Sequence, residues 1–354
     1  MVIVMTEKDK ILYVGYGFNG EPGLDSLLKN GSFDVVGVIA TPLGAGRYRV
    51  HGKELPLELL AHGQDIPVWQ TNENEVIYRA IKETNPKSVL LCVYNKILSD
   101  EILKSALSFF NVHHGCHLPR LRGSSNTEWA VRNGINKITI SLLKMVPGLD
   151  EGDLYWEPEI SITDDETIVD MRRKMNEVLR QNLGNVYEHI LHPERLPELS
   201  DVVYQSPQSK IKATYACSIR EEDSLIDWDQ PALDIYNVIR SVCDPELDPA
   251  YTFYQGKQLK VWKAKMIPAS RIWDGRIPGK PVSRSDDGVE VLTGDPEYAI
   301  LLQDVEIDGK KMPAKEVITS IRNTLGLHPL ELLKRIQALE QRLEQVEKGI
   351  TDSF

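Results

Sequence analysis

The sequence is poor in cysteine, with four cysteines in 354 residues, at positions 92, 116, 217 and 243. None forms a C-x-x-C pair, and four widely spaced cysteines are too few for a disulfide framework. The sequence also lacks an apolar run near the roughly 20 residues of a membrane span. Its N-terminal residues lack the long apolar region of a signal peptide. We therefore expect a protein with reduced thiols that works in the cytoplasm and not in a membrane.

Basic residues are also in deficit. The chain has 41 Lys and Arg against 52 Asp and Glu, a formal net charge of −11. Nucleic-acid binding usually depends on clustered Lys and Arg, so the overall charge gives no reason to expect it. Hydrophobic residues make up 42% of the chain, which is enough for a sizeable core, and the length suits two domains.

What the first half does contain is an alternation of apolar runs and helix-like stretches. This order is typical of an α/β domain with a doubly wound, Rossmann-like parallel sheet, which we assign to residues 1–200. Ligands of such sheets bind beyond the carboxyl ends of the strands. We expect strands at 11–14, 34–41, 66–70, 88–94 and 138–145, and helices at 24–31, 55–63, 75–85, 101–107 and 165–191.

The second half has a different texture. Residues 191–208 are rich in Pro, Ser and acidic residues, as in a linker. Short strands with turn signals follow, among them a hairpin at 251–267 with a Gln-Gly turn. They predict a small OB-like β-barrel domain over 207–326. We expect residues 328–350 to form a separate, amphipathic and charged helix.

A glycine motif follows the first expected strand. Gly15, Gly17 and Gly20 form G-x-G-x-x-G between a strand and a helix, as in dinucleotide-binding proteins. That fingerprint also needs an acidic residue roughly 20 positions later, and the strand at 34–41 ends without one. A tight strand-to-helix turn is the better interpretation, with an NAD(P)-dependent oxidoreductase as the alternative.

Residues 111–123, NVHHGCHLPRLRG, concentrate groups that can bind or transfer protons. Zinc ligation by His113, His114 and His117 would need a further ligand, and their spacing is not that of known zinc motifs. Cys116 as a nucleophile would need a base and an orienting group at a recognisable spacing. We favour neither interpretation.

Acid–base chemistry fits the same stretch better. A histidine transfers protons near pH 7, and a carboxylate can orient it. Asn111 stands two positions before His113, so in an extended segment both side chains lie on one side. We expect Asp150, in the turn 146–153 at a neighbouring strand end, to supply the carboxylate.

These motifs together resemble a known family. The order Asn-x-His, Leu-Pro-x-x-Arg-Gly, Trp-Ala, Gly-Leu-Asp-x-Gly-Asp is similar to that of formyltransferases that use 10-formyltetrahydrofolate. The stretches that match the family here are residues 93–98, 111–134 and 138–156. Residues 213–242 and 254–267 resemble the C-terminal domain of the members that formylate methionyl-tRNA or nucleotide-linked amino sugars.

The resemblance implies an enzyme with Asn111, His113 and Asp150 as its catalytic residues. Asn111 and a protonated His113 would stabilise a tetrahedral oxyanion, and Asp150 would hold the imidazole and raise its pKa. The stretch up to Pro119 is one residue longer than the family's usual spacing, so counting back from Pro119 would select His114 instead. By resemblance, the co-substrate 10-formyltetrahydrofolate contacts Tyr94, Asn95, Lys96, Ile97, Leu98, Met145, Val146, Gly148 and Leu149, without a metal.

The acceptor is a primary amine, and two classes compete. Residues 207–326 hold 16 Lys and Arg against 19 Asp and Glu, which favours a small molecule such as a nucleotide-linked amino sugar. Arg47, Arg49 and Lys53, in a loop similar to that of the tRNA-acting members, keep methionyl-tRNA as the alternative. A non-catalytic formyl-folate-binding module is a further alternative.

The tail carries a heptad seam. With Ile336 and Leu343 at a positions, Arg335 and Arg342 fall at g. In a parallel dimer each faces a glutamate at the following e position of the partner helix. We therefore predict a homodimer joined in part through this helix, with the seam residues Leu332, Ile336, Leu339, Leu343 and Val346 and the e-position residues Glu340 and Glu347.

Overall fold

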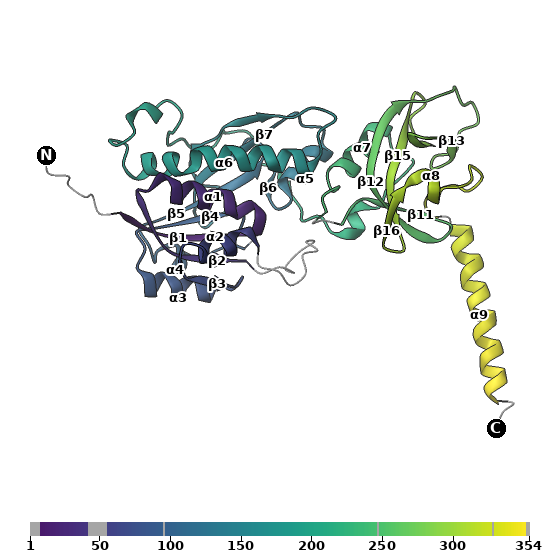
Figure 1. The fold of residues 1–354 in the computed structure, drawn as a ribbon, viewed down its shortest axis with the longest axis horizontal. Helices are drawn as coiled ribbons and strands as arrows, with labels where there is room; N and C mark the ends of the chain where they lie inside the picture. Colours follow the sequence, from purple (N-terminus) through teal and green to yellow (C-terminus); the bar gives the residue numbers. More distant parts are fainter. Residues whose placement is uncertain (1–7, 42–54, 95, 246–247, 328, 352–354) are drawn as a thin grey trace. The chain divides into compact units, whose positions relative to one another are not determined.

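The computed structural model of the protein describes residues 8–41, 55–94, 96–245, 248–327 and 329–351. The chain forms two compact units (Figure 1). The first comprises Met1–Arg220 with Asp244–Asp248, and the second Glu221–Cys243 with Pro249–Phe354. Among the described residues, no helix is both long and apolar enough to cross a membrane. The predicted fold class is confirmed: a Rossmann-like α/β unit precedes an antiparallel β unit and a C-terminal helix.

The first unit is built on an eight-stranded sheet of order β3-β2-β1-β4-β5-β7-β8, with β9 paired to β7. The strands from β3 to β5 are parallel, whereas β7 runs antiparallel to β5 and to both β8 and β9. The sheet is therefore mixed at one end. Its strands are β1 (Asp9–Gly15), β2 (Phe33–Ala40), β3 (Val68–Gln70), β4 (Ser88–Cys92), β5 (Ser108–Gly115), β7 (Lys137–Lys144), β8 (Leu154–Trp156) and β9 (Glu159–Ser161).

Helices cover both faces of this sheet, because successive strand residues face opposite sides. Ile11 and Tyr13 pack with helices α1, α2, α5 and α6, whereas Leu12 and Val14 pack with α3 and α4. Two short strands, β6 and β10, pair with each other outside the sheet. The bounds are α1 (Gly17–Asn30), α2 (Pro56–His62), α3 (Asn74–Thr84), α4 (Asp100–Leu103), β6 (Arg122–Gly123), α5 (Asn126–Arg132), α6 (Ile168–Leu191) and β10 (Tyr215–Ala216).

The glycine motif makes the β1-to-α1 turn. A Cβ atom on Gly20 would lie 3.1 Å from the Cα atom of Gly15, and Gly17 has a φ of +35°. The hydroxyl of the buried Tyr13 donates to the carbonyl of Gly20 at 2.5 Å. Close packing of helix on strand thus explains all three glycines, as expected of a tight turn.

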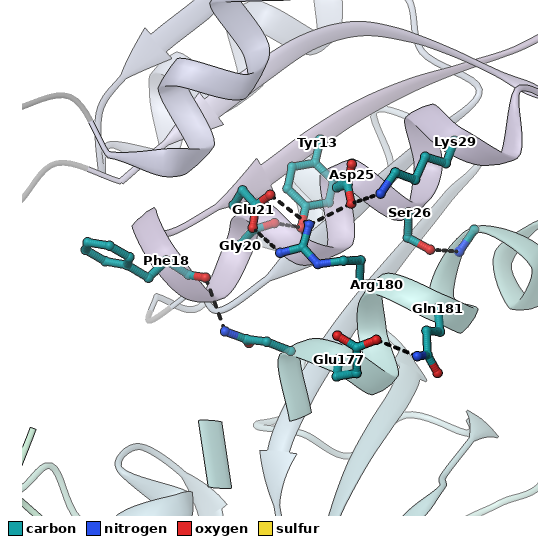
Figure 2. Close-up of polar contacts among 12 residues, drawn as sticks. Tyr13, Phe18, Gly20, Glu21, Asp25, Ser26, Lys29, Glu177, Arg180 and Gln181 are labelled. Carbon is teal, nitrogen blue, oxygen red and sulfur yellow. Dashed lines mark hydrogen bonds and ion pairs between the residues drawn. The ribbon is translucent and has the colours of Figure 1, made fainter. Parts of the chain in front are cut away.

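Helix α6, which we expected over 165–191, is held on α1 by an ionic network (Figure 2). Arg180 of α6 donates from Nη1 and Nη2 to Glu21 at 2.9 and 2.7 Å, and from Nη1 to Asp25 at 2.6 Å. A bidentate arginine fixes direction as well as distance. At the N-terminal end of α6, Thr167 and Asp170 form a capping box. The helix is therefore rigidly placed over the sheet.

The second unit is a six-stranded antiparallel sheet of order β11-β12-β15-β14-β13, with β16 beside β15. Gln255 and Gly256, both at positive φ, make the expected hairpin turn between β11 and β12. The elements of this unit are α7 (Ala232–Arg240), β11 (Tyr251–Tyr254), β12 (Lys257–Pro268), β13 (Pro281–Ser285), β14 (Gly288–Leu292), β15 (Tyr298–Ile307), β16 (Lys310–Pro313), α8 (Ala314–Val317) and α9 (Pro329–Thr351).

Candidate active site

Two of the three histidines, His113 and His114, lie within a strand, and His117 follows the end of that strand. Residues 108–115 form this one continuous strand, β5. Asn111 and His113 share one face, whereas Val112 packs with the apolar cluster of the opposite face. Because His114 is one position further along, it faces that opposite side. The strand thus separates the two candidate histidines.

His113 is the buried centre of a polar group, with 5% of its surface exposed. Its Nε2 atom lies 4.0 Å from Oδ2 of Asp150. The side-chain amide of Asn126, at the start of α5, donates to the same Nε2 at 3.0 Å. Within the described part of the chain, His113 Nδ1 and Asn111 Oδ1 are buried without a hydrogen-bond partner. Buried polar atoms are rarely left unpaired, so these two atoms are suited to a ligand.

Burial controls the charge of His113. Desolvation lowers the pKa of His113, and it outweighs the opposing effects of Asp150, the Leu121 backbone and Glu157. We expected Asp150 to raise the pKa of His113; its charge acts in that direction, but the net pKa is lowered. His113 is therefore neutral near pH 7, with Nε2 as an acceptor ready to take a proton.

His114 lies in a different environment. Burial lowers the pKa of His114 to about 3, and the charges of His113 and Arg172 act in the same direction. Arg172, on α6, forms ion pairs with Glu128 and Asp244. Next to His114, this otherwise apolar side of β5 thus holds a small group of buried ion pairs. The arrangement groups Asn111 with His113, and it leaves His114 outside that group.

Asp150 lies near His113 because of a chain path that the sequence did not indicate. Since β7 is antiparallel to β5, the loop after β7 leaves from the other end of the sheet, and residues 145–153 return toward His113. Asp150 has a φ of +50°, and its Oδ2 accepts from the backbone N–H of Gly123 at 3.0 Å. Gln208 donates to the carbonyls of Asp150 and Gly152 at 2.6 and 3.0 Å.

Residues 191–208, expected to form a linker, belong instead to the first unit.

The loop after β4 begins with backbone strain. Val93 has a φ of +61°, which is costly for a β-branched residue and is more common at functional sites. Asn74 then fixes the loop, accepting from Tyr94 Oη at 2.7 Å and donating to the carbonyl of Ile97 at 2.9 Å. Asn95, which we predicted to contact the formyl donor, lies outside the described residues. Lys96 is described and exposed.

The other predicted donor contacts divide into buried and exposed side chains. Leu98 is buried in an apolar cluster, and Tyr94 and Met145 pack against the same cluster. Ile97, Val146 and Leu149 are exposed. Gly148, in the same loop, has part of its surface exposed. Exposed apolar groups in these two loops are suited to contact the flat ring of a ligand.

The two competing interpretations of 111–123 gain no support. Among the residues that the structure describes, no group of His, Cys, Asp or Glu has the arrangement of a metal site. Burial raises the pKa of the Cys116 thiol more than Arg120 lowers it, so Cys116 is a poor nucleophile at neutral pH. The loop with Arg47, Arg49 and Lys53 lies outside the described residues.

Sequence reasoning missed three residues of the site. Asn126 donates to His113, Gln208 holds the Asp150 loop, and Glu157 acts on the charge of His113. Each comes from a segment at least 13 positions from its partner, and no local pattern marks it. Arg122 belongs to the Leu-Pro-x-x-Arg-Gly motif, and the sequence assigned no role to it. It donates to Glu151 at 3.0 Å and to Gln208 at 2.7 Å, next to Asp150.

The chain is similar to known proteins over most of its length. Residues 9–186 match the family model "Formyl transferase", and residues 218–322 match "Formyl transferase, C-terminal domain". The chain is 31% identical over 321 residues to the methionyl-tRNA formyltransferase of Caldanaerobacter subterraneus, covering 87% of this chain and 96% of that protein. It is 30% identical over 315 residues to the Bacillus subtilis enzyme of the same name, covering 85% and 91%.

Among the solved structures that share the fold are two formyltransferases. One is an N-formyltransferase from Helicobacter canadensis in complex with folinic acid and dTDP-3-aminofucose, with a TM-score of 0.58 and 15% identity over 84% of this chain and 99% of that one. The other is the methionyl-tRNA formyltransferase from Clostridium thermocellum, with a TM-score of 0.53 and 17% identity over 85% and 100%.

Proposed function

The chain belongs to the formyl transferase family of one-carbon transferases, whose formyl donor is 10-formyltetrahydrofolate, and we propose that it formylates a primary amine at Asn111, His113 and Asp150. The observation that carries this assignment of residues is the buried, neutral His113, which lies 4.0 Å from Asp150 and shares a face of β5 with Asn111. A neutral imidazole beside a carboxylate is suited to accept a proton in the course of a reaction.

In this proposal the nitrogen of the acceptor amine attacks the formyl carbon and forms a tetrahedral oxyanion. The Asn111 amide N–H stabilises that oxygen. His113 Nε2 takes the proton of the attacking amine, giving up the hydrogen bond from Asn126, and Asp150 stabilises the imidazolium. The bond between the formyl carbon and the folate nitrogen then breaks, and His113 returns the proton to that leaving nitrogen. No net oxidation occurs.

We propose a small acceptor, such as a nucleotide-linked amino sugar. The acidic balance of residues 207–326 supports it, because a small amine needs a local pocket and no extended basic surface. Methionyl-tRNA is the second candidate, and a separate observation favours it: curated methionyl-tRNA formyltransferases match the chain over nearly their full length.

Salt dependence separates these acceptors. For a small acceptor, we expect kcat/KM to change little with salt concentration, because few counterions are released on binding. Arg47→Ala combined with Arg49→Ala should then leave turnover near the wild-type value. Initial rates measured over a range of salt concentrations with each acceptor test this. A steep loss with salt that the double change removes would identify tRNA as the acceptor.

We also propose that the protein acts in the cytoplasm. The four cysteines are free thiols in the structure, and two of them, Cys92 and Cys116, are buried. Free cysteines are typical of proteins in a reducing compartment.

The C-terminal helix α9 supports the homodimer as a further proposal. Side chains of its seam are exposed, from 43% for Leu332 to 63% for Leu339. A stripe of this kind is more stable against a partner than in water. The charges at the g and e positions favour a parallel pair of identical helices. In such a pair Arg342 at g attracts Glu347 at e of the second copy, whereas an antiparallel pair would place like charges together. A second copy of this chain therefore fits the helix.

Removal of the helix should abolish the dimer. We expect light scattering to give the mass of two chains for the full-length protein and of one for a chain ending at Leu327. Arg342→Glu and Glu347→Arg should each weaken the dimer through like-charge repulsion, and mixing the two variants should restore it. A monomeric full-length protein, or a dimer that survives truncation, would contradict the proposal.

A further inference from the structure

His117, in the loop between β5 and β6, has no role in the proposed mechanism. Its Nδ1 lies 2.8 Å from Oε2 of Glu157, and its Nε2 lies 2.8 Å from Oε1 of Glu159. A carboxylate accepts hydrogen bonds, so both contacts form when both ring nitrogens carry a proton. Partial burial lowers the pKa of His117, but the two carboxylates outweigh burial and raise it above the ordinary value. The geometry is that of an imidazolium held between two anions.

Glu157 is the buried member of this carboxylate pair, with 10% of its side chain exposed against 45% for Glu159. Its Oε1 accepts from the Ser141 hydroxyl at 2.7 Å and from the backbone N–H of Leu118 at 3.2 Å. A buried carboxylate is costly unless a charge and donors satisfy it, and His117 supplies the charge. Glu157 thereby joins the lengthened loop to strand β7.

The same carboxylate lies close to the reacting histidine. Ser141 of β7 pairs with His113 of β5, and directly opposed residues of an antiparallel pair share a face. The charge of Glu157 favours the protonated form of His113, as the charge of Asp150 does. The third titratable group beside His113 is His114, which is neutral near pH 7.

We propose that Glu157 and His117 are positioning residues of the formyl-transfer site. Glu157 supplies a second negative charge that stabilises the imidazolium of His113, and His117 holds Glu157 and the loop in place. Neither touches the donor or the acceptor; both act through His113. The inference rests on the proposed function, because it assigns these residues to the same site.

The first test replaces Glu157 with glutamine, which keeps its shape and removes its charge. The His113 imidazole, followed by NMR in the full-length protein, should then titrate at a lower pH than in the wild type. The pH at which kcat/KM falls on the acidic side should also decrease, because His113 cannot accept a proton once it is protonated. We expect kcat to fall by roughly 3- to 10-fold, well short of the loss of Asp150.

Two further variants separate charge from structure. His117→Gln removes the cation and leaves an amide donor for Glu157, so the His113 midpoint should move to higher pH, opposite to Glu157→Gln. Glu159→Gln is the matched control: it faces the same imidazole from the exposed side, and the midpoint of His113 should stay unchanged. Shifts in one direction for both Glu157→Gln and His117→Gln, or an unmoved midpoint in both, would overturn the proposal.

The NMR titration needs no turnover, so the two proposals fail separately. If the wild type transfers no formyl group from 10-formyltetrahydrofolate to any amine, the proposed function is wrong whatever the titrations give. If the wild type is active and the His113 midpoint is the same in Glu157→Gln as in the wild type, the proposed function stands and the positioning role is wrong.

Discussion

Alanine at Asn111, His113 or Asp150 is expected to lower kcat by at least about 100-fold in each case. Asn111→Ala removes the donor to the oxyanion, His113→Ala removes the proton acceptor, and Asp150→Ala leaves the buried imidazolium without its nearest negative charge. Because the three residues act on one transition state, combining the changes should cost little more than the most damaging single change. Steady-state kinetics of purified, folded variants measures this directly.

His114→Ala is the matched control for His113→Ala. The two residues are adjacent in β5 and lie on opposite faces of the sheet, so His114→Ala should disturb the packing against α6 and leave folded enzyme with much of its activity. Circular dichroism establishes that each variant is folded. An active His113→Ala beside an inactive, folded His114→Ala would transfer the proposed role to His114.

Gly152→Ala is expected to have an effect as large as Asp150→Ala, although Gly152 carries no reactive group. A Cβ atom at this position would lie 1.6 Å from the carbonyl oxygen of Lys144, which is backbone and cannot rotate away. The turn that returns Asp150 to His113 must therefore open. A displacement of about 1 Å in such a site can cost roughly 100-fold in rate. We expect kcat to fall by about this factor while the melting temperature changes little.

Gly148→Ala, in the same loop, is the control for Gly152→Ala. It distinguishes an effect of opening the turn at Gly152 from a general effect of replacing a glycine in this loop. Its Cβ atom would meet Oε2 of Glu151 at 2.0 Å, the end of a flexible side chain that can move. The loss of activity should therefore be clearly smaller than for Gly152→Ala. Equal losses in both variants, or a fully active Gly152→Ala, would show that this turn does not position Asp150.

The sequence predicted those elements of the fold that have a clear local pattern, but not β5, the strand that carries Asn111 and His113. The apolar runs at 34–41 and 88–94 became β2 and β4, and the periodic stretch at 165–191 became α6. The direction of β7 could not be read from its residues, since buried parallel and antiparallel strands have similar composition. The path of the loop that carries Asp150 could not be predicted either, because it depends on the direction of β7.

The candidate site was predictable where its residues form a motif and not where they meet by folding. Asn111, His113 and Asp150 stand in recognisable patterns, and the structure brings His113 and Asp150 to 4.0 Å. The net direction of the His113 pKa shift depends on burial, which no spacing encodes. Gln208 reaches the site from a distant segment, and Asn126, although it lies within residues 111–134, belongs to none of the motifs recognised there.

The central claim is that this chain moves a formyl group from 10-formyltetrahydrofolate to an amine through His113. Its most direct test is mass spectrometry of full-length wild type and His113→Ala, each incubated with the donor and either a nucleotide-linked amino sugar or methionyl-tRNA. We predict that the wild type adds one formyl group to the amino sugar and that His113→Ala adds almost none in the same time. A wild type that binds the donor and formylates neither amine, or an equally active His113→Ala, would contradict the account.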